Sequence, residues 1–275
     1  MRKIGIGLAL LATMYSGSAV AQETAVPAPE ATVPGPEEQQ LTLPGGKLFL
    51  DAFLEFSLSK GAAFKPVSLA PDLWYGINDD LTLGLVHSAR GATGIFGSSG
   101  DGICFTGKKN GCEDGIYDNV GVDARYQLLR KVGISLAGSG GLYVNSFDPF
   151  KLALKVGGIA RFYKGAFSVE LDPNLFFGLT KRSEGAGNKE VLAVPATFMY
   201  AVTPKVGVAA QLALLMPIQY DELTMFGASV GAQYFITDQL ILDGAFSLPA
   251  LMGGKGVLVD GIDARTLTLG VAYAF

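Results

Sequence analysis

The one histidine of this 275-residue chain, His87, lies next to Ser88. A serine nucleophile needs a histidine base within hydrogen-bond reach and a third group that orients the imidazole ring. Adjacent residues of a strand point to opposite faces, so this pair would diverge, and the position that would share a face with His87 is Ala89. The sequence therefore offers no catalytic residue, and we expect that the protein is not an enzyme.

Other kinds of chemistry are also weakly represented. The sequence contains no phosphate-binding loop, dinucleotide-binding fingerprint or paired-cysteine zinc motif. Acidic residues in segment 91–115 could bind calcium through their carboxylate oxygens, although acidic loops are more often simply hydrated. The formal net charge of −4 and the lack of a basic patch argue against nucleic acid as a partner. We expect no metal and no cofactor.

The two cysteines, Cys104 and Cys112, are separated by seven residues in a glycine-rich stretch. Disulfides persist in exported proteins, so we predict that these two cysteines form one disulfide in the longest surface loop. Export is indicated by the N-terminus, where Arg2 and Lys3 precede a short apolar run and a small-x-small cleavage site ends at Ala21. The sequence therefore predicts a signal peptide over residues 1–21.

The composition is unusually apolar, with 49% hydrophobic residues, 17% charged residues and a mean hydropathy of +0.35. After residue 22, however, no run of about 18 apolar residues could form a spanning helix. Helices and closed barrels are the structures that satisfy their backbone inside lipid. We therefore predict an all-β transmembrane barrel over residues 47–275, preceded by a proline-rich, extended or disordered linker over residues 22–46.

Period-two alternation supports this prediction and gives about twelve strands in an up-and-down antiparallel order. The predicted strands are 47–58, 66–76, 81–90, 116–128, 132–144, 150–163, 166–180, 190–201, 205–217, 224–236, 239–249 and 262–275. Short turns alternate with longer loops, which is typical of outer-membrane barrels. Pro71, Pro173 and Pro195 fall inside these strands, and we interpret them as bulges or kinks at the rim.

The charged residues of the strands share one face, opposite the large apolar residues. If the apolar face meets lipid, this charged face lines the lumen, where water or ion pairs remove the cost of about 2–4 kcal/mol for a basic residue facing lipid. The predicted lumen-lining residues are Asp51, Glu55, Asp72, Arg90, Asp123, Arg125, Lys155, Arg161, Glu170, Asp172 and Asp243. Aromatic residues also share the inward parity, so either a constricted pore or a packed, ion-paired interior is consistent with the pattern.

Two further patterns indicate an outer-membrane protein. Aromatic side chains fall at equivalent strand ends, as in the two belts that flank a lipid bilayer. The last strand alternates through Leu267, Leu269, Val271 and Tyr273 to a terminal Phe275. This ending resembles the C-terminal signal of bacterial outer-membrane β-barrel proteins, the porin-like superfamily. The resemblance implies that Tyr273 and Phe275 are recognised by the barrel-assembly machinery.

The resemblance implies an outer-membrane location in a Gram-negative bacterium, contact with outer-membrane lipid and an N-terminal tail in the periplasm. Two functions remain open from the sequence. One is a porin-like channel that transports small polar solutes. The alternative is a non-conducting structural or surface-display barrel whose extracellular loops bind partners. Neither the solute nor the oligomeric state follows from the residues.

Overall fold

The computed structural model of the protein describes residues 40–59, 67–97, 102–105, 117, 119–183, 188–257 and 260–275. Both the predicted signal peptide and residues 22–39 of the predicted linker lie outside these residues. Within the described part of the chain, no helix is long and apolar enough to cross a membrane.

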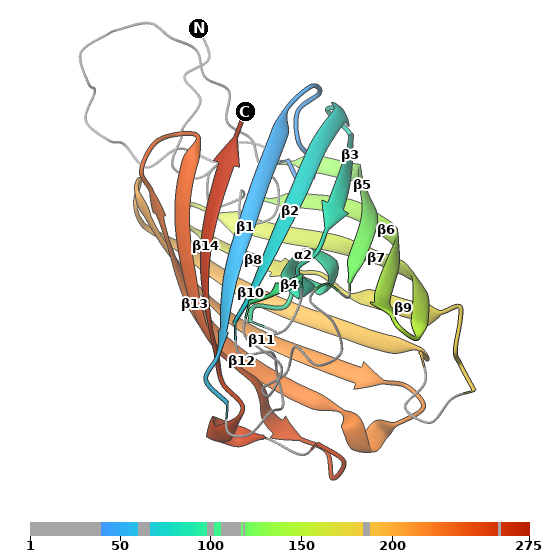
Figure 1. Ribbon diagram of the computed structural model, residues 1–275. Helices are drawn as coiled ribbons and strands as arrows, with labels where there is room; N and C mark the ends of the chain where they lie inside the picture. Colours follow the sequence, from blue (N-terminus) through green and yellow to red (C-terminus); the bar gives the residue numbers. More distant parts are fainter. Residues whose placement is uncertain are drawn as a thin grey trace, which may run out of the picture.

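The described chain is built almost entirely of antiparallel strands (Figure 1). These strands are β1 Leu48–Ser57, β2 Val67–Asn78, β3 Leu81–Val86, β4 Ile103–Cys104, β5 Val120–Lys131, β6 Ile134–Phe147, β7 Phe150–Lys164, β8 Phe167–Leu171, β9 Asn174–Gly178, β10 Val191–Thr203, β11 Val206–Pro217, β12 Met225–Phe235, β13 Leu240–Gly253 and β14 Thr266–Ala274. The helical pieces among the described residues are α2 Ala89–Thr93, η2 Asp221–Leu223 and η3 Gly261–Asp263.

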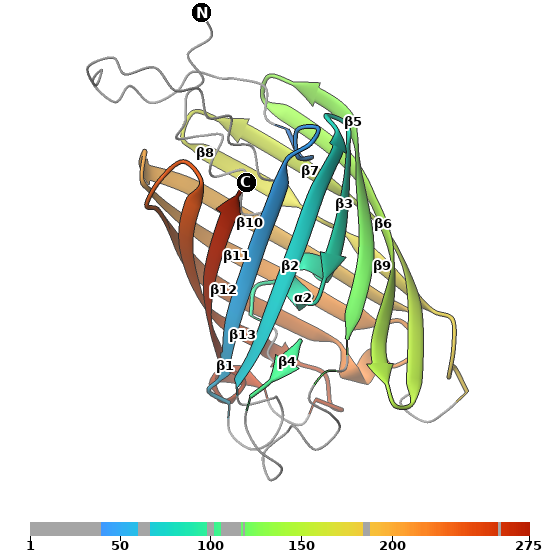
Figure 2. The ribbon, with the colours of Figure 1, turned by 45° about the horizontal axis from the view of Figure 1, so that its top comes forward.

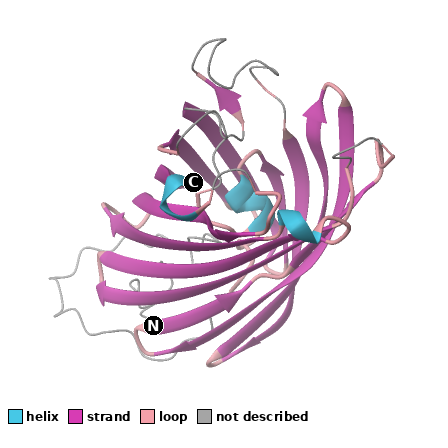
Figure 3. Ribbon diagram, turned by 90° about the horizontal axis from the view of Figure 1, so that it is seen from below, coloured by secondary structure: helices cyan, strands magenta, loops and turns pink. Residues whose placement is uncertain are grey.

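The strands close into a barrel because β1 pairs with β2 on one side and with β14 on the other. β8 and β9 occupy one position between β7 and β10, and the two-residue β4 lies on the rim beside β2. The wall therefore contains twelve strands, each hydrogen-bonded to its neighbours along the chain. Seen from below, they curve around a common interior (Figure 3). The predicted up-and-down barrel is confirmed.

Five short turns lie at one end of the barrel, together with Phe275, which donates its backbone N–H to Leu48 at 2.9 Å. Two of these turns are stabilised in the same way, because the hydroxyls of Thr203 and Thr237 each accept backbone N–H groups from the last residue of the turn and from the first residue of the next strand. The longer connections gather at the opposite end, which also has one two-residue turn, between Phe147 of β6 and Phe150 of β7. We call the two ends the short-turn end and the long-loop end.

Side chains alternate between a buried set inside the barrel and an exposed apolar set outside, as the period predicted. Tyr75, Tyr126, Phe162, Tyr200 and Tyr234 are all exposed on the outer surface near the short-turn end. Large aliphatic residues occupy the outer face between the two ends. A water-soluble fold would not leave so much apolar surface exposed, whereas a lipid bilayer covers it.

Several predicted strand limits are wrong by three or four residues: the strand predicted over 116–128 is Val120–Lys131, that over 132–144 ends at Phe147, and that over 239–249 ends at Gly253. Two further limits are wrong for a visible reason. The strand predicted over 81–90 ends at Val86, because Ser88 caps a short helix that turns away from the wall. The strand predicted over 262–275 begins at Thr266, because η3 occupies residues 261–263.

The three prolines are accommodated in different ways. Pro173 separates β8 from β9, as the expected kink, and its carbonyl still accepts from Gly158 at 3.1 Å. Pro195 lies within β10 in regular register with Ala213, and on its other side it faces this interruption. Pro71 on β2 pairs in register with Ala52 on β1. On the other side of β2, the pairing with β3 begins only at Leu73, so Pro71 has no partner residue in β3. Of the two interpretations, bulge or kink, a bulge is therefore wrong at Pro71 and Pro195, since neither position shifts the register.

Candidate functional site

The interior of the barrel is the candidate site, because it collects the charged side chains that the sequence singled out. Ten of the eleven predicted lumen-lining residues are buried: Asp51, Glu55, Asp72, Arg90, Asp123, Arg125, Lys155, Arg161, Glu170 and Asp172. The eleventh, Asp243, is of intermediate burial as a residue, but its side chain is only 6% exposed. Ten of the eleven belong to the strand wall or to the β8–β9 interruption. Arg90 instead belongs to α2. The prediction that it lies inside the barrel is therefore correct, but its position does not follow from the alternation of side chains along a strand.

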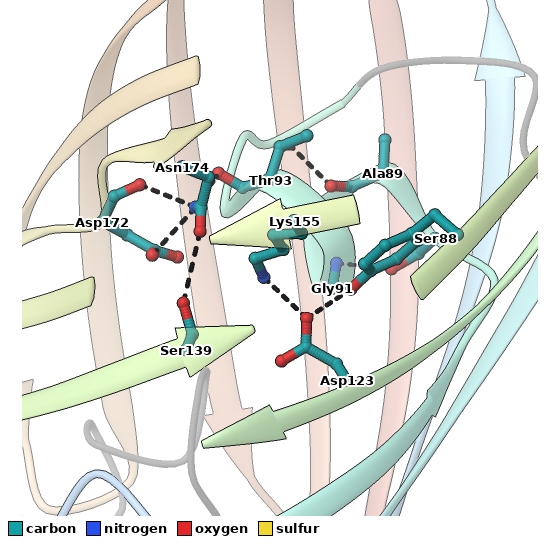
Figure 4. Close-up of polar contacts among 10 residues, drawn as sticks. Ser88, Ala89, Gly91, Thr93, Asp123, Ser139, Lys155, Asp172 and Asn174 are labelled. Carbon is teal, nitrogen blue, oxygen red and sulfur yellow. Dashed lines mark hydrogen bonds and ion pairs between the residues drawn. The ribbon is translucent and has the colours of Figure 1, made fainter. Parts of the chain in front are cut away.

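Two ion pairs lie along the wall. Arg161 on β7 and Glu170 on β8 are direct cross-strand partners, with 2.8 Å between Arg161 Nε and Glu170 Oε2. Lys155 on β7 reaches Asp123 on β5 at 2.8 Å, across Gly141 of the intervening strand. Figure 4 shows Lys155 pointing at the Asp123 carboxylate. Each pair follows the wall, so neither blocks the bore.

A segment of the chain, residues 87–97, fills the middle of the bore, and we call it the insert. It leaves the end of β3, forms α2 and is enclosed by the strands in both side views (Figures 1 and 2). Gly94 ends the helix in the left-handed conformation with φ 75°, which glycine adopts without strain. The sequence predicts a surface loop from residue 91 onward, and for residues 91–97 this prediction is wrong.

The insert is anchored where it enters the bore. The carboxylate of Asp72 accepts the backbone N–H groups of His87 at 2.7 Å and Ser88 at 2.9 Å, and also the Ser88 hydroxyl. The Ser88 hydroxyl in turn accepts from Gly91 N at 2.7 Å, which caps α2. His87 places its ring against the carbonyl oxygen of Pro71 and beside Tyr117. These contacts give both residues a structural role.

On the far side of the bore, the insert is held by other strands. Gln211 of β11 accepts from Phe96 N at 2.7 Å and donates to the carbonyl of Gly94 at 2.8 Å. Thr266 of β14 donates to the carbonyl of Gly97 at 2.6 Å. Asn174 of β9, which also bonds Asp172, donates to the carbonyl of Thr93 at 3.3 Å (Figure 4). The insert therefore bridges the bore from β3 to β9, β11 and β14.

Arg90 is the charged centre of this arrangement. Its guanidinium donates to Asp243 of β13 at 2.7 Å and lies 4.7 Å from the ring centroids of both Phe53 and Phe96. A small cavity of about 20 Å³ adjoins Arg90, between the Asp51 and Asp72 carboxylates and Arg125. Arg125 lies 3.9 Å from the centroid of the Trp74 ring. The interior thus combines charges with aromatic rings, as inward parity indicated.

The short-turn end is also occupied. Residues 40–46, which we call the strap, pack into the mouth of the barrel, with Leu41 and Leu43 only 1% and 2% exposed. Leu41 N donates to Gln127 at 2.8 Å, Leu43 N donates to Thr82 at 2.6 Å, and Gly45 N donates to Asp79 at 3.0 Å. These residues belong to the linker that the sequence predicts over 22–46. Packed structure in fact begins before residue 47.

The remaining predicted positions lie at the two ends. Cys104 is buried in β4 at the long-loop end, while Cys112 lies outside the described residues, so their disulfide stays a prediction. Tyr273 and Phe275 contact each other edge to face at 4.7 Å, and the Phe275 ring is 56% exposed. At the long-loop end, a hydrogen bond from Arg182 lowers the pKa of Glu190. Within the described residues, no cluster of His, Cys, Asp or Glu side chains could hold a metal ion.

Comparisons with known proteins agree with this architecture. No protein-family model matches the chain. No curated protein matches it in sequence. Among solved structures, the NanC porin superposes with a TM-score of 0.57 at 9% identity, covering 82% of this chain and 98% of the porin.

Two further structures are similar to the same degree. The KdgM porin in complex with disordered oligogalacturonate has a TM-score of 0.54 at 11% identity and covers 82% of this chain and 99% of its own. An outer membrane channel from Pseudomonas putida F1 has a TM-score of 0.55 at 15% identity and covers 85% of this chain and 97% of its own. At these identities the likeness concerns the fold. The chain therefore has the closed twelve-stranded fold of porin-like outer-membrane β-barrels.

Proposed function

We propose that this protein is an outer-membrane channel for small polar solutes, and that the insert closes its bore in the described conformation. One observation carries the proposal. Several buried polar groups of the bore wall have no hydrogen-bond partner among the described residues: Asp51 Oδ1, both amide atoms of Gln233, Ser247 Oγ and Thr268 Oγ1. In a permanently packed interior, each such group would cost about 1–3 kcal/mol. A bore that opens to water would hydrate them.

The way in which the insert is held supports the same conclusion. Its polar anchors are hydrogen bonds and one ion pair to the wall, and water can replace each of these when the insert moves out, whereas Phe96, Ile95 and Ala92 also pack against buried apolar side chains of the wall. A typical hydrogen bond contributes about 0.5–1.5 kcal/mol net, since its groups bond to water in the alternative state. The insert can therefore leave the bore without unfolding the twelve-stranded wall.

The alternative is a non-conducting structural or surface-display barrel. One observation favours it, because the strap and the insert fill the bore at two separate levels. A barrel that never conducts could use both segments as permanent filling, with its loops free to bind partners. The outer-membrane location, the periplasmic position of the N-terminal tail and recognition of Phe275 by the assembly machinery are part of either proposal.

Single-channel recording in planar bilayers separates the two functions. The mature protein would be compared with a variant in which residues 89–96 are replaced by a short Gly-Ser linker. A matched control replaces residues 219–223, which include η2 at the same end of the barrel. A channel predicts rare openings in the mature protein and steady conductance in the first variant only. Silence in all three folded proteins would favour the non-conducting barrel.

A further inference from the structure

A second, larger cavity of about 420 Å³ lies at the long-loop end, on the outer side of the insert. Its floor is formed by α2, through Ser88, Ala89, Ala92 and Thr93. Ligand pockets in proteins are typically about 300–1,000 Å³, so this space has the size of a small organic molecule. A molecule bound there would rest directly on the segment that closes the bore.

Most of the wall of this cavity is apolar. Val86, Val191 and Leu215 contribute aliphatic surface from three strands. Tyr143 and Phe176 contribute two rings that pack edge to face, with 5.7 Å between their centroids. Such a surface binds hydrocarbon or aromatic groups by excluding water from them.

The polar groups of the cavity are mostly engaged already. The Ser88 hydroxyl caps α2, the Thr93 hydroxyl donates to Ala89, and the Tyr143 hydroxyl donates to Asp123. Asn119 bridges His87 and Gly102 through both ends of its amide. These groups hold the protein together and leave little hydrogen-bonding capacity for a sugar, which would need many partners.

The charge of the cavity is positive. Lys151 and Lys189 both line it, whereas none of its described lining residues is acidic. The Lys189 ammonium group donates to Gln219 at 2.6 Å and lies 5.4 Å from the centroid of the Tyr220 ring, so part of its hydrogen-bonding capacity is already used. Lys151 has inward parity with Lys155 on β7 and makes no hydrogen bond or ion pair with the described residues. Its ammonium group is therefore available to an anion.

From this combination we infer that the cavity binds a small amphipathic organic anion. Its apolar or aromatic body packs against Phe176, Val191 and Leu215, and its carboxylate pairs with Lys151. The inference concerns binding alone. It goes beyond the proposed channel function and does not require the bore to open.

The inference can be tested by calorimetric titration of the mature protein in lipid nanodiscs, with empty nanodiscs as the blank. The probes are 4-phenylbutyrate, the neutral 4-phenylbutanol and the cationic 4-phenylbutylamine, which share one apolar body and differ in the charge of the head. We expect saturable binding in which the acid binds most tightly and the amine least tightly.

Three variants locate the site. Lys151→Gln should weaken binding of the acid about tenfold, the loss of one charge-assisted contact. Lys151→Glu should reverse the preference in favour of the amine. Leu215→Trp should weaken all three probes, because its indole occupies part of the cavity. Lys164→Gln, an exposed lysine at the opposite end of the barrel, serves as the matched control and should bind like the wild type.

Gel migration before and after boiling shows that each variant is folded. The inference is overturned if the acid does not bind saturably to the folded wild type, if the amine binds as well as the acid, or if Lys151→Gln retains full affinity. A protein that binds the acid but never conducts would contradict the proposed channel alone. A protein that conducts without binding the acid would contradict this inference alone.

Discussion

The ion pair between Arg90 and Asp243 should control how often the bore opens. Arg90→Ala removes the 2.7 Å bond to Asp243 and the stacking of the guanidinium on Phe53 and Phe96. A hydrogen bond to a charged group contributes about 1.5–3 kcal/mol, and each 1.4 kcal/mol changes an equilibrium tenfold. The ratio of open to closed bores should therefore rise by about 10- to 150-fold.

This range is a lower bound on the change, because the substitution also leaves the Asp243 carboxylate, whose side chain is 6% exposed, without its ion-pair partner in the closed state. The assay is the open probability of single channels in planar bilayers at fixed voltage. Arg90→Lys keeps the charge and should lie between the wild type and Arg90→Ala. Lys164→Ala, on the exposed short-turn end, should not change the open probability. An open probability that is the same in folded wild type and Arg90→Ala would refute the reasoning.

Three other outcomes follow from the structure. Deletion of residues 40–44 should raise the conductance of each open step, because Leu41 and Leu43 leave the short-turn mouth; unchanged step size would show that the strap does not obstruct it. The bore carries seven acidic and four basic residues among the eleven named above, so reversal potentials should show weak cation selectivity, less at high salt, and Glu170→Gln with Asp172→Asn should lower it. Steady anion selectivity in the wild type would contradict this assignment. Cys104 and Cys112 should resist thiol labelling on intact cells until a reductant is added, and labelling of both without reductant would exclude the disulfide.

The wall of the barrel could be predicted from the sequence because its signal is local. Leu267, Leu269, Val271 and Tyr273 alternate with small or polar residues, so the strand has one face of large apolar side chains and one face of small or polar side chains. In an up-and-down barrel each strand then pairs with its neighbours in the chain. The interruption at Pro173 was visible as a proline in a strand. That Pro195 faces it across the ladder was not visible, since the register between the two strands depends on the whole sheet.

The contents of the bore could not be predicted in the same way. The insert depends on contacts between residues far apart in the chain, such as Phe96 with Gln211 and Gly97 with Thr266. A local signal for its helix existed, because Ser88 is a preferred N-cap residue and Gly94 a preferred terminating glycine. The alternating pattern of residues 81–90 predicted a single strand, and the helix signal was therefore overlooked. The strap was missed for a related reason, since Leu41 and Leu43 are the few apolar residues next to a proline-rich stretch.

The central claim is that the insert closes the bore, and a reversible cross-link tests it most directly. A Cβ atom at Gly97 would lie 2.6 Å from Ser247 Cβ, whereas disulfides have about 3.5–4.5 Å between these atoms. Cysteines at the two positions should therefore form a disulfide once the insert shifts away from β13 by about 1 Å, with the cysteine at position 97 strained by its φ of 62°. The pair would be introduced together with Arg90→Ala, which keeps the bore open often, and with Cys104→Ser and Cys112→Ser to remove the native thiols. We predict that oxidation silences the channel in a planar bilayer and that reduction restores conductance. Full conductance with the insert verifiably cross-linked to β13 would contradict the account.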